Sequence, residues 1–258
     1  MAIIRNDNKV VDSPVTTSQP SLNQSVGSQF DEFAPKKATR KAVKLRLAVD
    51  GATGSGKTWS ALLIAFGLAP KKVIVIDTEN NSADLYSHLG EYDTITLKAP
   101  YSADRYKKAI HRAEQEGADV IIIDSFSHAW ASAGGMLDMQ NAVAKRTGNS
   151  YTAWRDVTPE HNALVEAILQ SPAHVIVTMR SKMEYIMETG IDGKTSVRKF
   201  GLAPIQRDGV EYEFTIVFDL DYMHQATVSK DRTSLFDGTS FKPSVETGQK
   251  IKNWLDTA

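Results

Sequence analysis

Residues 51–58, Gly-Ala-Thr-Gly-Ser-Gly-Lys-Thr, fit the phosphate-binding pattern G-x-x-x-x-G-K-[ST]. The segment follows an apolar run at 45–49 and precedes a helix-like stretch at 59–68, which is the strand–loop–helix context that this pattern requires. Glycines let consecutive backbone N–H groups point at phosphates, which also lie at the positive end of the following helix. We therefore expect the chain to bind a nucleoside triphosphate.

The phosphate loop has a defined set of candidate ligands. The residues expected to surround the phosphates are Gly51, Ala52, Thr53, Gly54, Ser55, Gly56, Lys57 and Thr58. Loops of this kind place the Lys57 ammonium at the β- and γ-phosphates and the Thr58 hydroxyl on Mg²⁺. ATP and Mg²⁺ are therefore the expected cofactors.

Charge and composition narrow the class of protein further. Lysine and arginine number 30 against 31 acidic residues, so the net charge of -1 does not indicate a protein that coats nucleic acid, although it is compatible with a local basic surface. The chain has no cysteine and hence no disulfide or thiolate-bound metal. It has neither an apolar run of about 18 residues nor a signal-peptide core, so we expect a soluble, cytoplasmic protein that binds no membrane.

The chain divides into an arm and one domain. Residues 1–38 are rich in Ser, Thr, Gln, Asn and Pro without a period of 2 or 3.6, which predicts a disordered arm. From residue 39 to 258, short apolar strands alternate with helical stretches, the pattern of a mostly parallel α/β sheet covered on both faces. A basic run from Lys36 to Arg46 at the start of this domain predicts a solvated edge.

The expected elements follow from hydrophobic periodicity and turn residues. Strands are expected at 44–50, 72–77, 93–97, 119–124 and 173–179. Helices are expected at 57–68, 103–116, 136–146 and 158–170. Beyond residue 180 we expect two antiparallel pairs and a last helix, at 184–189 with 194–200 around a turn at 190–193, at 212–220 with 225–230, and at 245–255.

Two strands end in carboxylates that suit nucleotide chemistry. The run 120–123 leads into Asp124, where a nucleotide hydrolase places the aspartate that holds Mg²⁺. Ser125 follows it, so the base that orients water has to come from elsewhere. Glu79 lies just past the strand at 72–77, at the edge where parallel sheets present ligands, and is the candidate base. Capping of a helix that begins near Ser82 is its alternative role.

These carboxylates resemble the RecA-type core, in which one strand ends in Asp-x-Glu and the magnesium strand ends in Asp-Ser. Asp77-Thr78-Glu79 and Asp124-Ser125 match the two patterns. The closer resemblance is to phage-encoded, core-only RecA-like ATP-binding proteins, several of which act in single-strand annealing. It is carried by HVIVTMRSKMEY (174–185), GLAPIQRDGVEYEF (201–214) and SKDR (229–232), and it covers about residues 44–235. It implies a RecA-like P-loop NTPase core with C-terminal antiparallel hairpins.

The resemblance also implies roles for basic residues. In RecA-like proteins, two basic residues at the place of Lys230 and Arg232 reach the γ-phosphate bound by the neighbouring subunit. Their i, i+2 spacing puts both on one face of a strand. Arg180, with Thr178, is the candidate sensor of the γ-phosphate. We therefore expect a homo-oligomer, either a ring or a filament, with ATP at the subunit interfaces.

The resemblance places single-stranded DNA on the loops after the strands at 119–124 and 173–179. The candidate DNA contacts are Lys194, Arg198, Lys199 and Arg207, with Phe200 as a stacking platform, and Tyr151, Trp154 and Arg155 as further candidates. Acidic residues within 181–209 nearly cancel the bases there, so charge alone does not establish a groove. A single-stranded-DNA-binding protein is a candidate partner.

The predicted function is Mg-ATP hydrolysis by an oligomeric RecA-like ATPase that acts on single-stranded DNA in phage recombination or annealing, in the host cytoplasm. Two alternatives stay open. A P-loop kinase for a small molecule would use 181–209 as a lid, but it would leave Glu79 and the pair Lys230 and Arg232 without a role. A non-enzymatic, ATP-dependent switch or loader would bind nucleotide and hydrolyse little.

Overall fold

The computed structural model describes residues 34–257, except residues 36, 42 and 190–194, and describes residues 184–189 and 195–201 by their backbone alone. Thr39–Ala258 form one compact unit, and the unit before it, Met1–Ala38, lies almost entirely outside the described residues. The predicted disordered arm therefore stays a prediction. Among the described helices, none combines the length and the apolar character needed to cross a bilayer.

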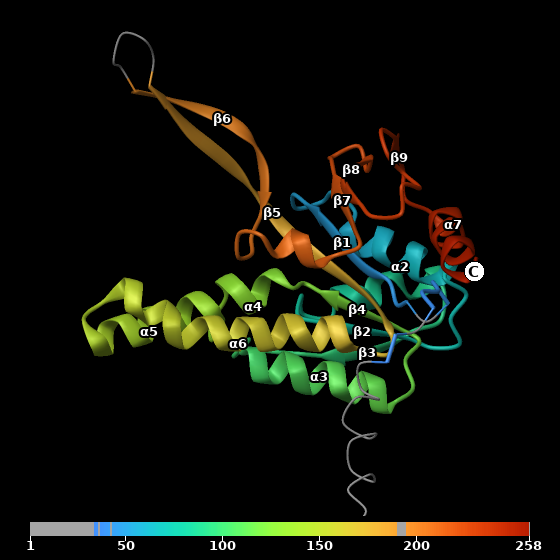
Figure 1. The fold of residues 1–258 in the computed structure, drawn as a ribbon, viewed down its shortest axis with the longest axis horizontal. Coiled ribbons are helices and arrows are strands. Elements are labelled where there is room, and N and C mark those ends of the chain that lie inside the picture. The colour runs from blue at the N-terminus through green and yellow to red at the C-terminus, as the bar shows by residue number, and fades with distance from the viewer. Residues whose placement is uncertain (1–33, 36, 42, 190–194, 258) are drawn as a thin grey trace, which may run out of the picture. The chain divides into compact units, whose positions relative to one another are not determined.

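A nine-stranded sheet organises the domain (Figure 1). In chain order its strands are β1 (Arg46–Gly51), β2 (Val73–Asp77), β3 (Asp93–Thr96), β4 (Val120–Asp124), β5 (His174–Thr189), β6 (Thr195–Pro204), β7 (Ile216–Leu220), β8 (Ala226–Asp231) and β9 (Ser240–Phe241). They lie in the order β3-β2-β4-β5-β1-β7-β8-β9, and β6 pairs with the second half of β5. The strands from β3 to β7 in this order run parallel, whereas β6, β8 and β9 are antiparallel to their neighbours. The predicted fold class, an α/β RecA-like P-loop NTPase core with antiparallel hairpins after its parallel sheet, is confirmed.

Helices cover both faces of the sheet. One face carries α2 (Lys57–Gly67) and α7 (Val245–Asp256). The other face carries α3 (Ala103–Gln115) and α6 (Ser150–Gln170), with α4 (Ser127–Ala131) and α5 (Met136–Thr147) leading into α6. Two 3₁₀ helices, η2 (Ser82–Leu89) and η3 (Val210–Glu213), lie in the connections after β2 and β6.

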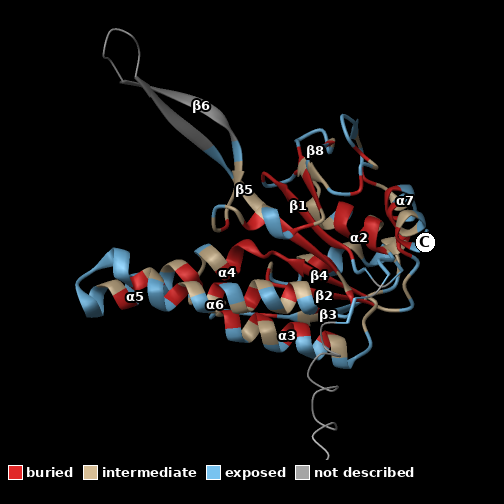
Figure 2. Ribbon diagram, viewed as in Figure 1, coloured by how far each residue is buried: buried red, intermediate tan, exposed pale blue. Residues whose placement is uncertain are grey.

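Alternation along the strands divides the core into two layers, and Figure 2 shows the central strands β1, β2 and β4 buried along their length. In β2, Ile74 and Ile76 belong to the layer under α3 and α6, whereas Val73 and Val75 belong to the layer under α2. Successive strand residues point to opposite faces, so a strand covered on both sides is apolar at every position. The apolar runs in the sequence therefore reflect burial on both faces of the sheet.

The element predictions hold along the parallel sheet and differ in three places. Helix α6 begins at Ser150 rather than at 158, because the Asn149 side chain caps it by accepting from the backbone N–H groups of Tyr151 and Thr152, and Pro159 lies within the helix. Strand β5 runs unbroken from the sheet into the hairpin, where two separate strands were predicted. Elements α4, η3 and β9 were not predicted, and the strand predicted from 212 begins at 216, whereas η2 begins at Ser82, where the alternative role of Glu79 placed a helix. The predicted turn at 190–193 lies outside the described residues.

The basic run that starts the domain does not end on a solvated edge. Arg46 is only 6% exposed, and burial lowers its pKa to about 10. Its guanidinium donates to four carbonyl oxygens, those of Leu45, Leu169, Ser171 and Ala173, at 2.5–2.9 Å. The prediction is wrong for this residue because the end of α6 and the turn into β5 leave carbonyl groups that the guanidinium satisfies.

Candidate active site

The phosphate loop joins the end of β1 to the start of α2. Gly54 and Gly56 have φ angles of +80° and +87°, the left-handed region that glycine adopts without steric cost. A Cβ on Gly56 would lie 3.0 Å from Nδ1 of His224, which comes from the turn between β7 and β8. The same nitrogen lies 3.0 Å from the carbonyl oxygen of Ser55. His224, which the sequence analysis did not single out, therefore packs directly on the loop.

Lys57 begins α2, and its ammonium lies over the loop. Its Nζ donates to the carbonyl oxygens of Gly51 at 3.0 Å and Ala52 at 2.8 Å. Burial lowers the pKa of Lys57, while the charges of Asp124 and Glu79 act in the opposite direction. The carbonyl oxygens of the phosphate loop thus hold the Lys57 ammonium in place.

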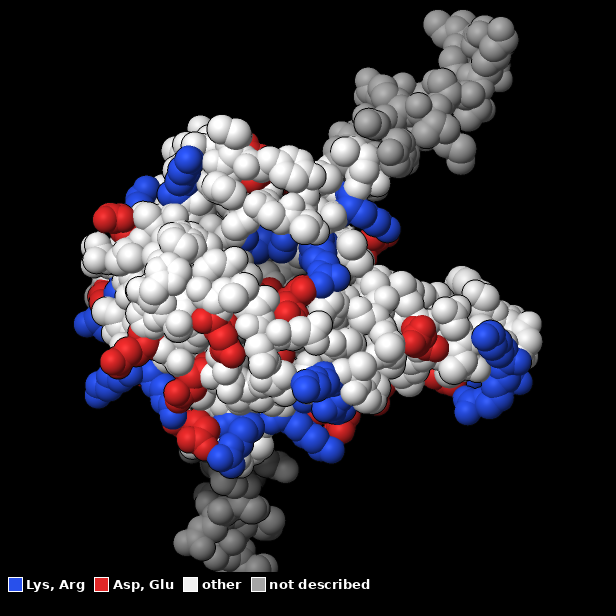
Figure 3. Space-filling view, turned by 180° about the vertical axis from the view of Figure 1, so that it is seen from behind, with Lys and Arg blue, Asp and Glu red and all other residues white. Residues whose placement is uncertain are grey.

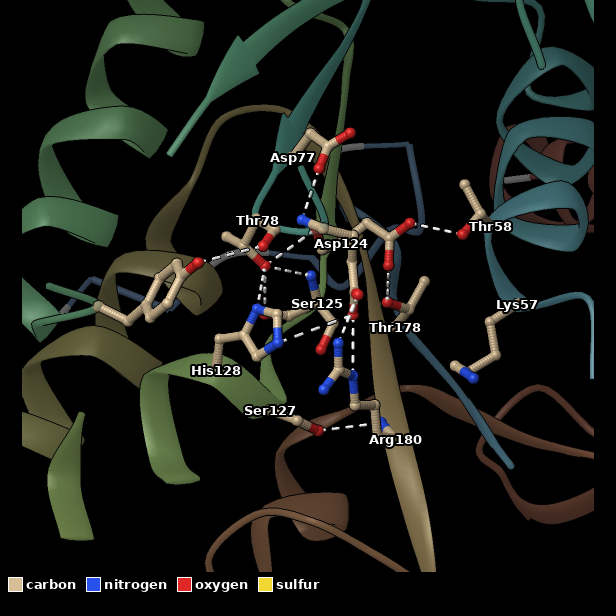
Figure 4. A network of polar contacts seen from close by, with 12 residues as sticks. Lys57, Thr58, Asp77, Thr78, Asp124, Ser125, Ser127, His128, Thr178 and Arg180 are labelled. Atoms are coloured by element: carbon tan, nitrogen blue, oxygen red, sulfur yellow. Dashed lines mark hydrogen bonds and ion pairs between the residues drawn. The ribbon is translucent and has the colours of Figure 1, made fainter. Parts of the chain in front are cut away.

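Asp124 lies buried at the end of β4 between two hydroxyl groups (Figure 4). Its Oδ2 accepts a hydrogen bond from Thr58 Oγ1 and its Oδ1 accepts one from Thr178 Oγ1, each at a distance of 2.5 Å. Burial raises the pKa of Asp124, and these two hydrogen bonds oppose the rise. Strand order brings the three residues together, because β4, β5 and β1 are consecutive neighbours and Thr58 follows the loop after β1.

The donor set at Asp124 suits Mg²⁺. This ion commonly takes one or two protein oxygens and completes its shell with phosphate oxygens and water. Thr58 and Asp124 offer one hydroxyl and one carboxylate within hydrogen-bond distance of each other, beside the loop expected to bind the phosphates. Among the described residues, no three His, Asp or Glu side chains gather to hold a metal by themselves. The geometry therefore fits an ion that arrives with a nucleotide.

Glu79 follows β2, the neighbour of β4, in a tight turn that Asp77 shapes. The Asp77 carboxylate accepts from the backbone N–H of Glu79 at 2.6 Å and from that of Ala83 at 2.9 Å. Arg180, at the point where β5 leaves the sheet, binds both oxygens of Glu79, with Nε 2.9 Å from Oε1 and Nη2 in contact with Oε2. The candidate base and the candidate γ-phosphate sensor are thus paired with each other.

A second polar layer lies behind Glu79 and was not predicted. Thr78 Oγ1 accepts from the backbone N–H of Ser125 at 2.8 Å and lies 2.7 Å from Nδ1 of His128. The other ring nitrogen of His128 is 3.9 Å from Glu79 Oε1, and the ring of Tyr101 lies against it at 4.9 Å between centroids. A lone histidine in the first turn of a short helix carries no sequence signal for this role; the packing of α4 against the end of β2 brings it there.

Two acidic side chains lie side by side on neighbouring strands at the start of the phosphate loop. Asp50 of β1 and Asp219 of β7 are register partners. Burial and the charge of Asp219 raise the pKa of Asp50, and burial also raises that of Asp219. Both shifts favour the protonated form of the pair, which limits the negative charge beneath a phosphate-binding loop.

A cavity of about 500 Å³ adjoins the phosphate loop. Its lining comes from four segments far apart in the chain, namely Gly54, Gly56, Trp59, Ser60, Tyr86, His224, Lys242 and Pro243. The rings of Trp59 and Tyr86 meet edge to face at 5.8 Å between centroids. A cavity with aromatic walls beside a phosphate loop can receive the nucleoside of a bound nucleotide.

A model of the AAA domain family matches residues 43–247, which span most of the chain and every residue of the site above. The chain belongs to this AAA-domain family. No curated protein matches it. Among solved structures, a KaiC-like protein from the hyperthermophilic archaeon Pyrococcus horikoshii OT3 is similar at 16% identity over 80% of this chain and 94% of that chain, with a TM-score of 0.44. Family and fold together make the chain a P-loop nucleotide-binding protein of the ATPase class.

In this AAA-domain protein, the predicted pair, Lys230 at the end of β8 and Arg232 just after it, lies away from the protein's own phosphate loop. Lys230 Nζ donates to the carbonyl oxygens of Glu211 at 2.9 Å and Tyr212 at 2.6 Å, and Arg232 Nη2 donates to that of Tyr212 at 2.9 Å. The shared carbonyl shows that both side chains lie on one side of the chain. This end of β8 pairs with the start of β7, which lies beside the start of β1, whereas the phosphate loop follows the end of β1. The role in a neighbouring subunit stays a prediction.

The predicted DNA contacts are only partly within the described residues. Lys194 lies outside them, and Arg198 and Lys199 are placed by their backbone on β6, opposite Ile186 and Tyr185. Arg207 is half-buried. Phe200 is likewise described by its backbone alone. These assignments therefore stay predictions.

The aromatic candidates between β4 and β5 divide in two. Trp154 is half-buried and stacks on Trp130 at 5.6 Å between centroids, so it packs against the core instead of offering a free face to a base. Tyr151 is 88% exposed, and Arg155 is exposed as well. The prediction of a stacking surface is thus wrong for Trp154, because the second aromatic ring covers it, and it stays open for Tyr151.

Proposed function

We propose that this AAA-domain protein hydrolyses ATP with Mg²⁺ at the phosphate loop. The observation that carries the proposal is the convergence of three groups on one edge of the sheet: the loop after β1, Asp124 at the end of β4 and Glu79 after β2. Parallel strands present ligands at their carboxyl ends, and β2 and β4 are direct neighbours there. A kinase or a passive nucleotide switch would not require a carboxylate at the position of Glu79.

Each residue has a defined task in this proposal. The loop N–H groups and Lys57 bind the phosphates, and Thr58 with Asp124 would hold Mg²⁺, which supplies charge neutralisation on the transferring phosphoryl group when bound. Glu79 orients the attacking water and accepts its proton. Thr178 keeps the Asp124 carboxylate oriented through its hydroxyl.

The working form in this proposal is a homo-oligomer that acts on single-stranded DNA in phage recombination or annealing. Support comes from the position of Lys230 and Arg232. In this structure their side chains bind carbonyl oxygens near the start of β1, away from the phosphate loop of their own subunit. Further support comes from the free end of the α5–α6 hairpin, where Figure 3 shows lysine and arginine side chains gathered. Lys145, Arg146 and Arg155 are exposed there beside Tyr151, a combination suited to phosphates and unstacked bases.

Replacing Glu79 with Gln tests the hydrolytic proposal, because the side chain keeps its shape and loses only its charge. We expect turnover to fall by about 10² or more while nucleotide affinity is retained. Glu91→Gln, at an exposed position, is the matched control and should hydrolyse normally. The assay is ATP hydrolysis per subunit across protein concentration, with and without single-stranded DNA, and the rate should rise with both. Normal hydrolysis by Glu79→Gln would refute the assignment, and a rate independent of concentration and DNA would refute the oligomer and the DNA role.

A further inference from the structure

In this structure Glu79 is paired with Arg180 and is not free to turn toward a water molecule. Arg180 occupies both of its oxygens in a bidentate arrangement, the strongest geometry for a guanidinium and a carboxylate. The pair is sheltered, with side-chain exposures of 25% for Glu79 and 41% for Arg180. Each carboxylate oxygen keeps a second lone pair for other donors, but the pairing holds the Glu79 carboxylate toward the guanidinium and keeps it from turning toward an attacking water.

Arg180 is placed to exchange this partner for a phosphate. Its backbone is fixed, because its N–H donates to Ser127 Oγ at 2.9 Å and its carbonyl accepts from the N–H of Ile205 at 2.6 Å. It is the register partner of Gly51, the first residue of the phosphate loop. Its positive charge also contributes to lowering the pKa of Lys57. Only the long side chain has to move to bring the guanidinium to a γ-phosphate held there.

His128 offers a second hold on the same carboxylate. The shortest contact of the Thr78 hydroxyl is to Nδ1 of His128, at 2.7 Å, and a hydroxyl that donates to this nitrogen leaves the ring proton on Nε2. Nε2 faces Glu79 Oε1 at 3.9 Å, a gap that a small rotation of Glu79 closes. The ring is buried between Tyr101 and Thr78, so it is the fixed member of the pair. Burial and the charge of Arg180 keep its pKa low.

We propose that Arg180 latches Glu79 until a γ-phosphate draws the guanidinium away, and that His128 then positions the freed carboxylate. The latch rests on the proposed ATPase function and adds its control: a diphosphate leaves Arg180 on Glu79, and a triphosphate releases it. Hydrolysis is thereby tied to the presence of the group to be transferred. Arg180 directly precedes Ser181, the first residue of β5 paired in the β5–β6 hairpin, so the site and that hairpin are joined through the chain.

The test reads the environment of His128 by NMR of its ring nitrogens, a signal independent of turnover. A non-hydrolysable ATP analogue should shift the His128 resonance, ADP should leave it near its nucleotide-free position, and Arg180→Gln should show the shifted position without any nucleotide. The other histidine resonances report that the variant is folded. Identical His128 signals with ADP and the analogue, or an unshifted signal in Arg180→Gln, would overturn the latch while leaving hydrolysis intact as a proposal.

A kinetic arm tests the positioning role of His128. His128→Gln should lower kcat roughly 10- to 100-fold with nucleotide affinity unchanged, because a misplaced carboxylate affects the reaction and not binding. His111→Gln, at an exposed position on α3, is the control. An unchanged kcat in His128→Gln would remove His128 from the proposal. Failure of both nucleotides to bind the native protein would refute the proposed function itself, and the latch with it.

Discussion

At the scale of single residues, Arg46 carries a charge into the interior because the backbone around it provides acceptors. Its guanidinium binds three carbonyl oxygens between the end of α6 and the start of β5, and also that of Leu45, which directly precedes β1. Hydrogen bonds from a charged donor are worth more than neutral ones, and carbonyl groups left without a donor in the interior are costly. The residue therefore ties the first strand of the domain to an element more than one hundred positions later in the chain.

Arg46→Met should destabilise the protein by at least about 2 kcal/mol, because methionine fills much of the volume but donates to none of the four carbonyl groups. The measurement is denaturant unfolding followed by circular dichroism. Arg112→Met, on the exposed side of α3, removes only a surface ion pair with Glu116 and should change stability by less than about 1 kcal/mol. Equal stabilities for the two variants would show that the Arg46 hydrogen bonds contribute no net stability.

At the scale of elements, two hairpins extend from the edge of the sheet that carries the phosphate loop. The α5–α6 pair follows the end of β4, and the β5–β6 pair continues from the end of the parallel part of β5. Asp124 and Arg180 lie at the roots of these hairpins, so each hairpin is joined by the chain to a residue of the site. Both are candidate DNA contacts, the first on its exposed cations and the second by the sequence prediction for Lys194, Arg198 and Lys199.

Replacing Lys145, Arg146 and Arg155 together by Ala should weaken single-stranded DNA binding and flatten its salt dependence by up to about 2 in the log–log slope, since each lost phosphate contact contributes about 0.7. The measurement is a DNA titration at several salt concentrations. Replacing Lys98, Lys108 and Arg112, three exposed cations elsewhere, is the matched control. An unchanged slope would remove the α5–α6 tip from the DNA surface, and the same substitutions at Lys194, Arg198 and Lys199 would then test the other hairpin.

At the scale of the whole molecule, the proposed role of Lys230 and Arg232 requires a second copy of the chain. Lys230 and Arg232 are held on the carbonyl groups at the end of η3, beside the start of β1 and not its end. A cation placed there can neutralise charge on a γ-phosphate only if another subunit binds that nucleotide. The carbonyl oxygens that bind these cations carry no net charge, so the cations can also leave them for a phosphate.

Changing Lys230 and Arg232 together to Ala should leave ATP binding intact and slow hydrolysis, because on this proposal both residues act on the neighbour's nucleotide. Mixing this variant with Glu79→Gln subunits decides the question. Interfaces where an intact Glu79 meets intact cations should recover activity, measured as hydrolysis per subunit in mixtures shown to co-assemble. Two inactive variants that stay inactive together would show that the two basic residues act within their own subunit or only support the fold.

The sequence by itself determined the features whose cause is local. The loop at 51–58 depends on glycine conformations and on a helix that starts directly after it, and the strands depend on apolar runs buried from both faces. Asp124 and Glu79 could be placed at the sheet edge because each follows such a run within two residues. The α/β class with a mostly parallel sheet follows from the same alternation of strands and helices.

Tertiary structure alone decided which of these groups touch. Glu79 and Arg180 are 101 positions apart and meet because β2, β4 and β5 are consecutive in the sheet. The same strand order, with the packing of α4, brings His128 beside Glu79, and the turn between β7 and β8 carries His224 to the loop. Periodicity fixes which face a residue occupies, but strand order and register fix its neighbours, and these are set by the packing of the whole domain. For that reason the burial of Arg46 and the engagement of the candidate base by Arg180 are visible only in the folded chain.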